Sequence, residues 1–418
     1  MKLRLGRAFG VMIALAVQGF AIFVGDPLIP VDRLITNTTA YIREHPDDAM
    51  GPYTLARIHY LALASRASTV LGWWERSGLP TVNEPNERPS VSRANGWTEA
   101  ELRDHLKQSV ENYQKALKMD ERNALFHLGL ASVSGAALKA GFRLGPIPGA
   151  EAAEPPKDGD FTALWREQAI REYLKAYELS IGTNGTVSYG HIAHGLFFYL
   201  ISHEAGQHYV ELVTERGVRD SERETFVKIR SSLETLSGPL RGAITPVLFR
   251  LSEATPLDAL LDPDTTVAFD LNGTRLPQRY TWVRPDTGIL VWDPANEGRI
   301  VSGHQLFGSV TFQMFWPDGY RALDSLDDNR DGELRGGELK GLAVWFDRNQ
   351  NGISDPGEVV SIEQTGISAL SARATTRAGA SLANEQGLRM NDGRTLPTYD
   401  WTTEPLPDIS ESRGLPRS

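Results

Sequence analysis

Two consecutive loops of twelve residues, rich in side-chain oxygen atoms, most restrict how this chain can fold. The first is residues 327–338, DDNRDGELRGGE, and the second is residues 347–358, DRNQNGISDPGE. A calcium ion takes about six to eight oxygen ligands, and a twelve-residue loop supplies them from positions 1, 3, 5, 7, 9 and 12 around a glycine at position 6. Both loops follow this spacing, so the sequence predicts two calcium sites.

The first loop has a nearly complete set of ligands, with Gly332 at the turn and Leu334 as an apolar anchor. Arg335 stands at position 9, where a cationic side chain cannot bind a metal ion and a water molecule would have to take its place. The predicted ligands are Asp327, Asn329, Asp331, the carbonyl of Glu333 and the bidentate carboxylate of Glu338.

The second loop has a ligand at every position, with Gly352 at the turn and the polar Ser354 at position 8. The alternative for both loops is a pair of solvated turns closed by Asx side chains. Two matches to the spacing in tandem favour metal binding over that alternative. The predicted ligands are Asp347, Asn349, Asn351, the carbonyl of Ile353, Asp355 and Glu358.

The segment between the loops, residues 339–346 (LKGLAVWF), is too short for two flanking helices. Its apolar residues predict one shared helix that packs against a core, which favours a structural or buffering site over a switch. A decayed third copy is visible at residues 293–304, where Ala295 and His304 replace ligands at positions 3 and 12. The favoured interpretation of this copy is a glycine-containing turn between strands.

Four segments around these loops carry a family resemblance: FDLNG (269–273), LVWDPANEGRIVSGHQLFG (290–308), LAVWFDRNQNGISDPGE (342–358) and TGISALS (365–371). They resemble the calcium-binding EF-hand-type repeat region of bacterial secreted and envelope proteins. The resemblance covers residues 264–400 and implies a small α+β domain of short strands and helices. It also implies calcium at the two intact loops and no catalytic activity.

The first half of the chain has a helical pattern from residue 36 to residue 236. Residues 111–133 resemble a tetratricopeptide junction, and comparable pieces occur at residues 46–60 and 169–179. These features predict an all-α, tetratricopeptide-like repeat domain whose groove binds another protein or a peptide. The alternative is an ordinary helical domain, because polar insertions at residues 75–97 and 141–160 interrupt the period.

The expected organisation is therefore multidomain. A proline-containing stretch at residues 237–263 is expected to link the two domains, and residues 402–418 are expected to be a disordered tail. Residues 1–25 combine basic residues with an apolar run, which predicts a secretory signal or an uncleaved anchor. We therefore expect an exported protein, periplasmic, in the cell envelope or secreted, that meets a membrane only through this segment.

Composition restricts the chemistry further. The chain has no cysteine, which excludes disulfides and thiolate sites, and its formal charge of −10 disfavours a nucleic-acid partner. Four histidines fall in one region, but His203 and His208 are five residues apart and so do not share a helix face as zinc ligands must. The other two are His191 and His194.

The sequence contains no nucleophile elbow and no phosphate-binding glycine loop, so we expect no enzyme activity. Two alternatives stay open. The first is an envelope hydrolase with an accessory calcium domain, which would bring the histidines and the Trp73–Trp74 pair into one pocket. The second is a structural envelope protein in which the calcium loops are vestigial.

Overall fold

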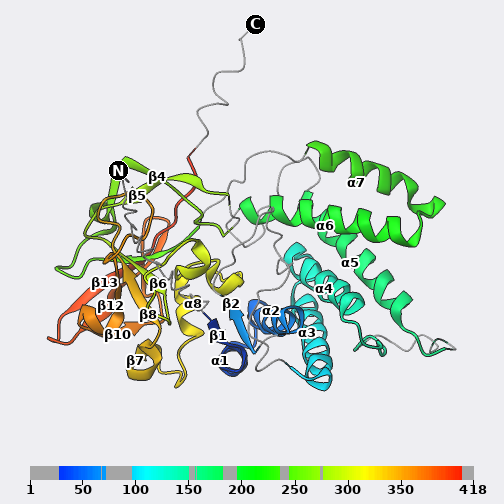
Figure 1. The fold of residues 1–418 in the computed structure, drawn as a ribbon, viewed down its shortest axis with the longest axis horizontal. Helices are drawn as coiled ribbons and strands as arrows, with labels where there is room; N and C mark the ends of the chain where they lie inside the picture. The colour runs from blue at the N-terminus through cyan, green and yellow to red at the C-terminus, as the bar shows by residue number, and fades with distance from the viewer. Residues whose placement is uncertain are drawn as a thin grey trace, which may run out of the picture.

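The computed structural model describes residues 28–66, 68–71, 97–149, 156, 158–181, 195–235, 244–273 and 276–406. A helical half formed by the first part of the chain lies beside a half built on β-strands (Figure 1). The signal-like segment at residues 1–25, the Trp73–Trp74 pair, His191 and His194 lie outside the described residues. No helix among the described residues is long and apolar enough to cross a membrane.

The helical half confirms the prediction of an α-helical region. Helix α3 begins at a capping box in which the Thr98 hydroxyl and the Glu101 carboxylate satisfy each other's backbone amides, and Asn123 caps helix α4. A Cβ atom on Gly129 would overlap the Tyr113 ring, so this glycine allows α3 and α4 to pack closely. The helices are α1 (Val31–Glu44), α2 (Met50–Ser65), α3 (Glu99–Met119), α4 (Ala124–Lys139), α5 (Thr162–Ile181), α6 (Gly195–Arg216) and α7 (Arg223–Thr235).

The C-terminal half is built on an antiparallel sheet of nine strands in the described part of the chain. The strand order is β7-β10-β12-β13-β3-β6-β8-β9, with β11 paired to β12, while β4 and β5 form a separate hairpin. The short pair β1 (Leu28–Pro30) and β2 (Thr69–Leu71) belongs to the helical half. The other strands are β3 (Val247–Phe249), β4 (Leu261–Phe269), β5 (Gln278–Val283), β6 (Gly288–Trp292), β7 (Glu333–Arg335), β8 (Leu342–Trp345), β9 (Val359–Ser361), β10 (Ile367–Ser371), β11 (Thr376–Ala378), β12 (Ser381–Met390) and β13 (Thr395–Asp400).

The predicted helix over residues 339–346 is wrong. A short 3-10 helix, Gly336–Leu339, ends in this segment, and strand β8 follows it between β6 and β9. All four residues of β8 are buried, so both of its faces are covered. A strand buried on both faces has a continuous apolar run, which local periodicity cannot distinguish from a short buried helix.

The stretch expected to be a linker, residues 237–263, contributes to the sheet in its described part. Strand β3 lies inside the sheet between β13 and β6, and all three of its residues are buried. Its neighbour Ile244 pairs with Thr403, a residue expected to lie in a disordered tail. The small α+β domain expected over residues 264–400 is thus corrected to a β-rich half that also recruits residues on both sides.

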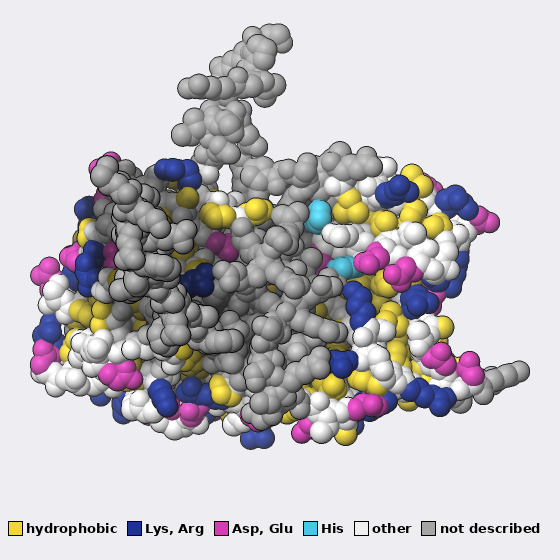
Figure 2. All heavy atoms as spheres, viewed as in Figure 1, with side chains coloured by type: hydrophobic (Ala, Val, Ile, Leu, Met, Phe, Trp, Pro, Cys, Tyr) yellow, Lys and Arg dark blue, Asp and Glu magenta, His cyan; other side chains and the backbone are white. Residues whose placement is uncertain are grey.

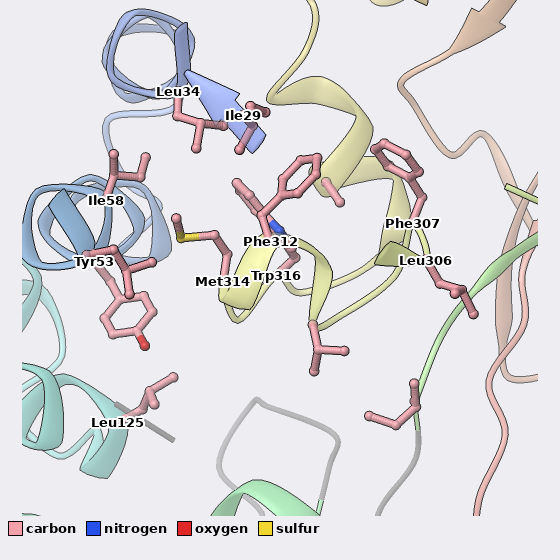
Figure 3. Close-up of a cluster of buried hydrophobic side chains, with 14 of the residues drawn as sticks. Ile29, Leu34, Tyr53, Ile58, Leu125, Leu306, Phe307, Phe312, Met314 and Trp316 are labelled. Atoms are coloured by element: carbon pink, nitrogen blue, oxygen red, sulfur yellow. The ribbon is translucent and has the colours of Figure 1, made fainter. Parts of the chain in front are cut away.

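The two halves share one hydrophobic core. Figure 3 shows Ile29, Tyr53 and Ile58 of the helical half facing Phe312 and Met314 of the other half. These two residues lie on a segment that leads through Trp316 to helix α8 (Gly319–Asp324). The helical half therefore packs on the sheet half through apolar side chains and does not stand apart from it.

A buried arginine reinforces this contact. Arg57 of α2 is 2% exposed, its Nε donates to the Gln313 carbonyl at 2.7 Å, and its guanidinium lies 4.4 Å from the centre of the Phe315 ring. On the coloured parts of the face in Figure 2, acidic and basic side chains are interspersed and do not gather by sign.

Candidate metal centre

The two candidate loops occupy different positions in the sheet half. Loop 1, Asp327–Glu338, follows helix α8 and contains strand β7, which pairs with β10. Loop 2, Asp347–Glu358, connects β8 to β9, where Trp345 pairs with Val359. Loop 2 is therefore the connection of a β-hairpin, and no helix flanks it on either side.

Both loops turn at a glycine whose amide binds the first carboxylate. The Gly332 amide donates to Asp327 Oδ2 at 2.8 Å, and the Gly352 amide donates to Asp347 Oδ2 at the same distance. The φ angles of these glycines are 89° and 73°, a region that strongly favours glycine. The glycine at position 6 thus has the role that the spacing predicts.

The glutamate at position 12 closes each loop. In loop 1, Glu338 accepts from the amides of Asp328 and Arg335, both at 2.9 Å. In loop 2, Glu358 accepts the equivalent bonds from positions 2 and 9 at 2.8 and 3.1 Å. The two loops therefore share one hydrogen-bonded framework although their flanking elements differ.

The middle side chains bind the loop backbone in Asx turns. Asn329 Oδ1 accepts from the Asp331 amide, and Asp331 Oδ1 accepts from the Glu333 amide, both at 2.8 Å. Loop 2 repeats this arrangement at Asn349 and Asn351. Such turns form with or without a metal ion, so they do not decide between a calcium site and a plain turn.

One oxygen atom of loop 1 favours a cation. Asp327 is 0% exposed, and its Oδ1 has no hydrogen-bond partner among the described residues. Burial raises the pKa of Asp327 above its usual range, against the opposing effect of the Gly332 and Arg330 amides. An unpaired carboxylate oxygen in a buried position is energetically unfavourable. A hard cation bound at this oxygen atom would offset the energy of leaving it unpaired, so the residues of loop 1 fit a calcium ion.

Loop 2 sits on an aromatic cluster. The Trp282 indole donates to Asp347 Oδ2 at 2.6 Å, and the Trp282 ring lies 6.0 Å from Trp345 and 5.9 Å from Phe269. Asp347 is 0% exposed, and burial raises the pKa of its carboxyl group. Strand β5 thus holds the first ligand position of loop 2 through a tryptophan that the loop pattern alone does not reveal.

Three of the predicted ligands of loop 2 contact one another. Asp355 Oδ2 accepts from Asn349 Nδ2 at 2.7 Å and from Asn351 Nδ2 at 2.9 Å. These hydrogen bonds lower the pKa of Asp355.

In the described part of the chain, no group of three or more Asp, Glu or His side chains is gathered closely enough to hold a metal ion. The case for calcium therefore depends on the loop framework and on the unpaired oxygen of Asp327.

The decayed copy at residues 293–304 folds like the other two loops. Asp293 Oδ2 accepts from the Gly298 amide at 2.8 Å, as position 1 does in loops 1 and 2. Gln305, one residue beyond the expected position, replaces the closing glutamate: its Oε1 accepts from the Val301 amide at 2.9 Å, and its Nε2 donates to the Arg299 carbonyl at 2.8 Å. An amide nitrogen thus satisfies the position-7 carbonyl that would otherwise bind a metal ion.

The histidines expected for the hydrolase alternative do not form a site in the described residues. His208 Nδ1 lies 3.1 Å from Glu211 Oε2, and its ring packs on Tyr173. The structure also describes a histidine pair that the sequence did not indicate: His59 and His105 join α2 to α3 with 2.8 Å between their Nδ1 atoms. Burial lowers the pKa of His59 to about 4, as expected for a neutral residue in a helix interface.

A family comparison concerns the sheet half. Residues 259–403 match the family model of the SPM domain. A curated relative, "Iron-regulated protein FrpA" of Neisseria meningitidis serogroup C, is 35% identical over 142 residues, which is 32% of this chain and 13% of that protein. The chain therefore spans only a small part of the length of that relative.

These findings correct the resemblance drawn from the loops. The family model that matches this region is the SPM domain and not an EF-hand family. The fold agrees, because strands β8 and β9 border loop 2 where an EF-hand would have helices. Ligand spacing is a local property of twelve residues, whereas the flanking elements depend on the sheet that surrounds them.

Proposed function

We propose that this chain is an exported calcium-binding protein in which loop 1 and loop 2 of the SPM domain each hold one Ca²⁺. The orphaned Oδ1 of the buried Asp327 carries this proposal, together with the hydrogen-bonded framework that loop 2 repeats. The ligands would be Asp327, Asn329, Asp331, the Glu333 carbonyl and Glu338 in loop 1, and Asp347, Asn349, Asn351, the Ile353 carbonyl, Asp355 and Glu358 in loop 2.

The ion would stabilise the fold. Both loops begin at a fully buried carboxylate, Asp327 and Asp347, that burial disfavours in its charged form. A divalent cation compensates these charges only when the loop is folded, so its binding free energy adds to the free energy of unfolding. Loop 2 would transmit this stabilisation to the sheet directly, since it connects β8 to β9.

The helical half would bind a protein or peptide partner. The α3–α4 junction, at which Tyr113 packs on Gly129, supports a tetratricopeptide-like arrangement. No catalytic step is part of the proposal, because His208 is engaged in helix packing and the His59–His105 pair joins two helices. Export is supported by the basic and apolar pattern of residues 1–25.

The test is a calcium titration of the full-length protein by calorimetry, with thermal melts in parallel. We expect two saturable sites and a rise in melting temperature. Glu338→Gln and Glu358→Gln should each remove or strongly weaken one site, while Glu363→Gln, an exposed position of helix α9 (Ile362–Thr365), should keep both. Absence of binding at millimolar calcium would overturn the proposal, as would an unchanged stoichiometry in both loop variants.

Terbium luminescence can separate the two sites. Tb³⁺ occupies calcium sites and is excited by energy transfer from a nearby indole. The Trp282 indole contacts Asp347, so terbium in loop 2 should be strongly sensitised. We expect Glu358→Gln to abolish most of this signal and Glu338→Gln to leave it largely intact. A signal equally sensitive to both variants would argue against binding at loop 2.

A further inference from the structure

Helix α1 of the helical half lies directly on loop 1. Arg33 Nε donates to Asp328 Oδ1 at 2.8 Å, and its Nη2 donates to the Leu326 carbonyl at 2.8 Å. Asn37, which is 3% exposed, donates through Nδ2 to the Ser325 carbonyl at 2.9 Å and to Asp328 Oδ1 at 2.8 Å. Two side chains of α1 thus converge on one carboxylate oxygen at position 2 of the loop.

A second contact lies at position 4. Arg330 Nη2 donates to Glu44 Oε2 at 2.9 Å, at the last residue of α1, and Arg330 Nη1 donates to the Asp324 carbonyl at 3.1 Å. Arg330 has a φ of 62°, an unfavourable angle for a residue with a side chain. The guanidinium of Arg321 covers the Tyr41 ring of the same helix at 3.3 Å from its centre. Contacts to loop 1 and to the preceding helix α8 are therefore distributed along the whole length of helix α1.

These contacts lead to a predicted ligand. The backbone amide of Asp328, whose side chain Arg33 and Asn37 hold, donates to Glu338 Oε1 at 2.9 Å. Glu338 is the bidentate ligand predicted at position 12. A continuous path of hydrogen bonds therefore runs from α1 through Asp328 to the carboxylate that would close the metal site.

Among the described residues, no hydrogen bond or ion pair joins loop 2 to the helical half. At its position 2, Arg348 donates to the Gly357 carbonyl of the same loop, and at its position 4, Gln350 donates to Asp262 and to the Val283 carbonyl. All of these partners belong to the sheet half. The molecule thus contains two similar loops, one held by its own half and one held by the other half.

We propose that helix α1 positions loop 1 for calcium, so that metal binding at loop 1 and docking of the helical half stabilise each other. Arg33 and Asn37 are the positioning residues, and neither is a ligand. This inference rests on the proposed function, because it requires calcium to bind loop 1. Such coupling is reciprocal: the docked helix raises the affinity for calcium by the same factor by which calcium favours docking.

The test uses substitutions that conserve charge, since removing Arg33 would also change the electrostatic potential at the cation. Arg33→Lys keeps the charge and loses the forked contact, while Asn37→Ala removes a neutral side chain. In full-length protein carrying Glu358→Gln, which leaves loop 1 as the intact site, this double variant should bind calcium about fivefold or more weakly, the lower range of typical coupling. The matched control is Arg43→Lys with Thr36→Ala, two exposed positions of α1.

A second measurement separates positioning from general destabilisation. In full-length protein carrying Glu338→Gln, where loop 2 is the intact site, the Arg33→Lys and Asn37→Ala pair should leave the calcium affinity unchanged. Hydrogen exchange of the otherwise unmodified protein should slow in α1 when calcium is added, and Glu338→Gln should abolish this slowing. Both measurements can therefore be interpreted even if the double variant no longer binds calcium at loop 1.

The outcomes distinguish the two proposals. Calcium binding with the same loop 1 affinity in the double variant and the control would overturn the positioning role and leave the proposed function intact. Equal weakening of both loops would also overturn it, because the effect would then be a general loss of stability. Absence of calcium binding in the unmodified protein would overturn both proposals.

Discussion

The turn glycines of loop 2 provide a quantitative test of how this loop packs on the sheet half. Gly352 and Gly357 have positive φ angles of 73° and 87°. A Cβ atom on Gly352 would overlap the Val267 side chain of β4 and approach the Ala268 carbonyl at 3.1 Å, whereas a Cβ on Gly357 would meet nothing within 4 Å. The two positions thus share a backbone constraint and differ in the space around them.

We expect Gly357→Ala to destabilise the protein by about 1–2 kcal/mol, the usual energy of a left-handed conformation in a residue with a side chain. Gly352→Ala carries the same term plus the effect of overpacking, about 1–3 kcal/mol more. Its total is therefore about 2–5 kcal/mol. The difference between the two variants isolates the packing of loop 2 against Val267.

The assay is equilibrium unfolding in urea, performed without calcium so that the result does not depend on metal binding. Gly352→Ala should have the lower midpoint, with an unchanged slope if both variants unfold in the same manner. A second substitution, Val267→Ala in the Gly352→Ala background, should recover part of the loss by removing the overlapping methyl groups. Equal midpoints for the two glycine variants would refute the close packing of loop 2 on β4.

Two further predictions concern buried polar groups. Because the pKa of His59 falls from its ordinary value near 6.5 to about 4 on folding, the unfolded chain binds the proton more readily. The contribution of neutral His59 to the free energy of unfolding should be complete above pH 6.5 and should be lost as the pH falls toward 4. His59→Gln should therefore reduce the pH dependence of the free energy of unfolding measured in urea. An identical pH profile in the variant would contradict this prediction. Trp282→Phe removes the hydrogen bond to the buried Asp347 carboxylate and should destabilise the protein by about 2–4 kcal/mol, from the lost charge-assisted bond and the smaller ring. Trp316→Phe is the control for terbium sensitisation, because the Trp316 indole is also buried but donates to the Thr311 carbonyl. Trp282→Phe should lower the terbium signal from loop 2 and Trp316→Phe should leave it unchanged; the remaining signal of Trp282→Phe comes from Trp345, whose ring lies 6.0 Å from that of Trp282.

Some features of the two loops were predictable from local sequence patterns. The turn glycines at position 6 were predictable from the spacing. The side chains at positions 1, 3, 5 and 12, predicted as metal ligands, make hydrogen bonds within their own loops, because their partners lie within twelve residues. The helical region was also predictable, since apolar spacing and the caps at Thr98 and Asn123 are local signals. Residues 339–346 were not, because a buried strand and a short buried helix have the same composition.

The contacts made by the loops could not be predicted in the same way. Asp347 receives its hydrogen bond from Trp282, and Asp328 receives its bonds from Arg33 and Asn37, residues far away in the chain. Gln305 closes the decayed loop one residue beyond the expected position, because the framework tolerates an insertion that a fixed spacing does not. Long-range pairs of this kind leave no periodic signal in a single sequence.

The sequence by itself determined the two oxygen-rich loops, their turn glycines and the helical character of the first half, since each depends on interactions between neighbouring residues. The tertiary structure decided that Leu342–Trp345 is a strand, because β6 and β9 supply the hydrogen bonds that an isolated segment would have to find within a helix. It also decided that loop 1 meets helix α1 while loop 2 meets β4 and β5. The shared core brings residues hundreds of positions apart into contact, and only the complete fold specifies which of them meet.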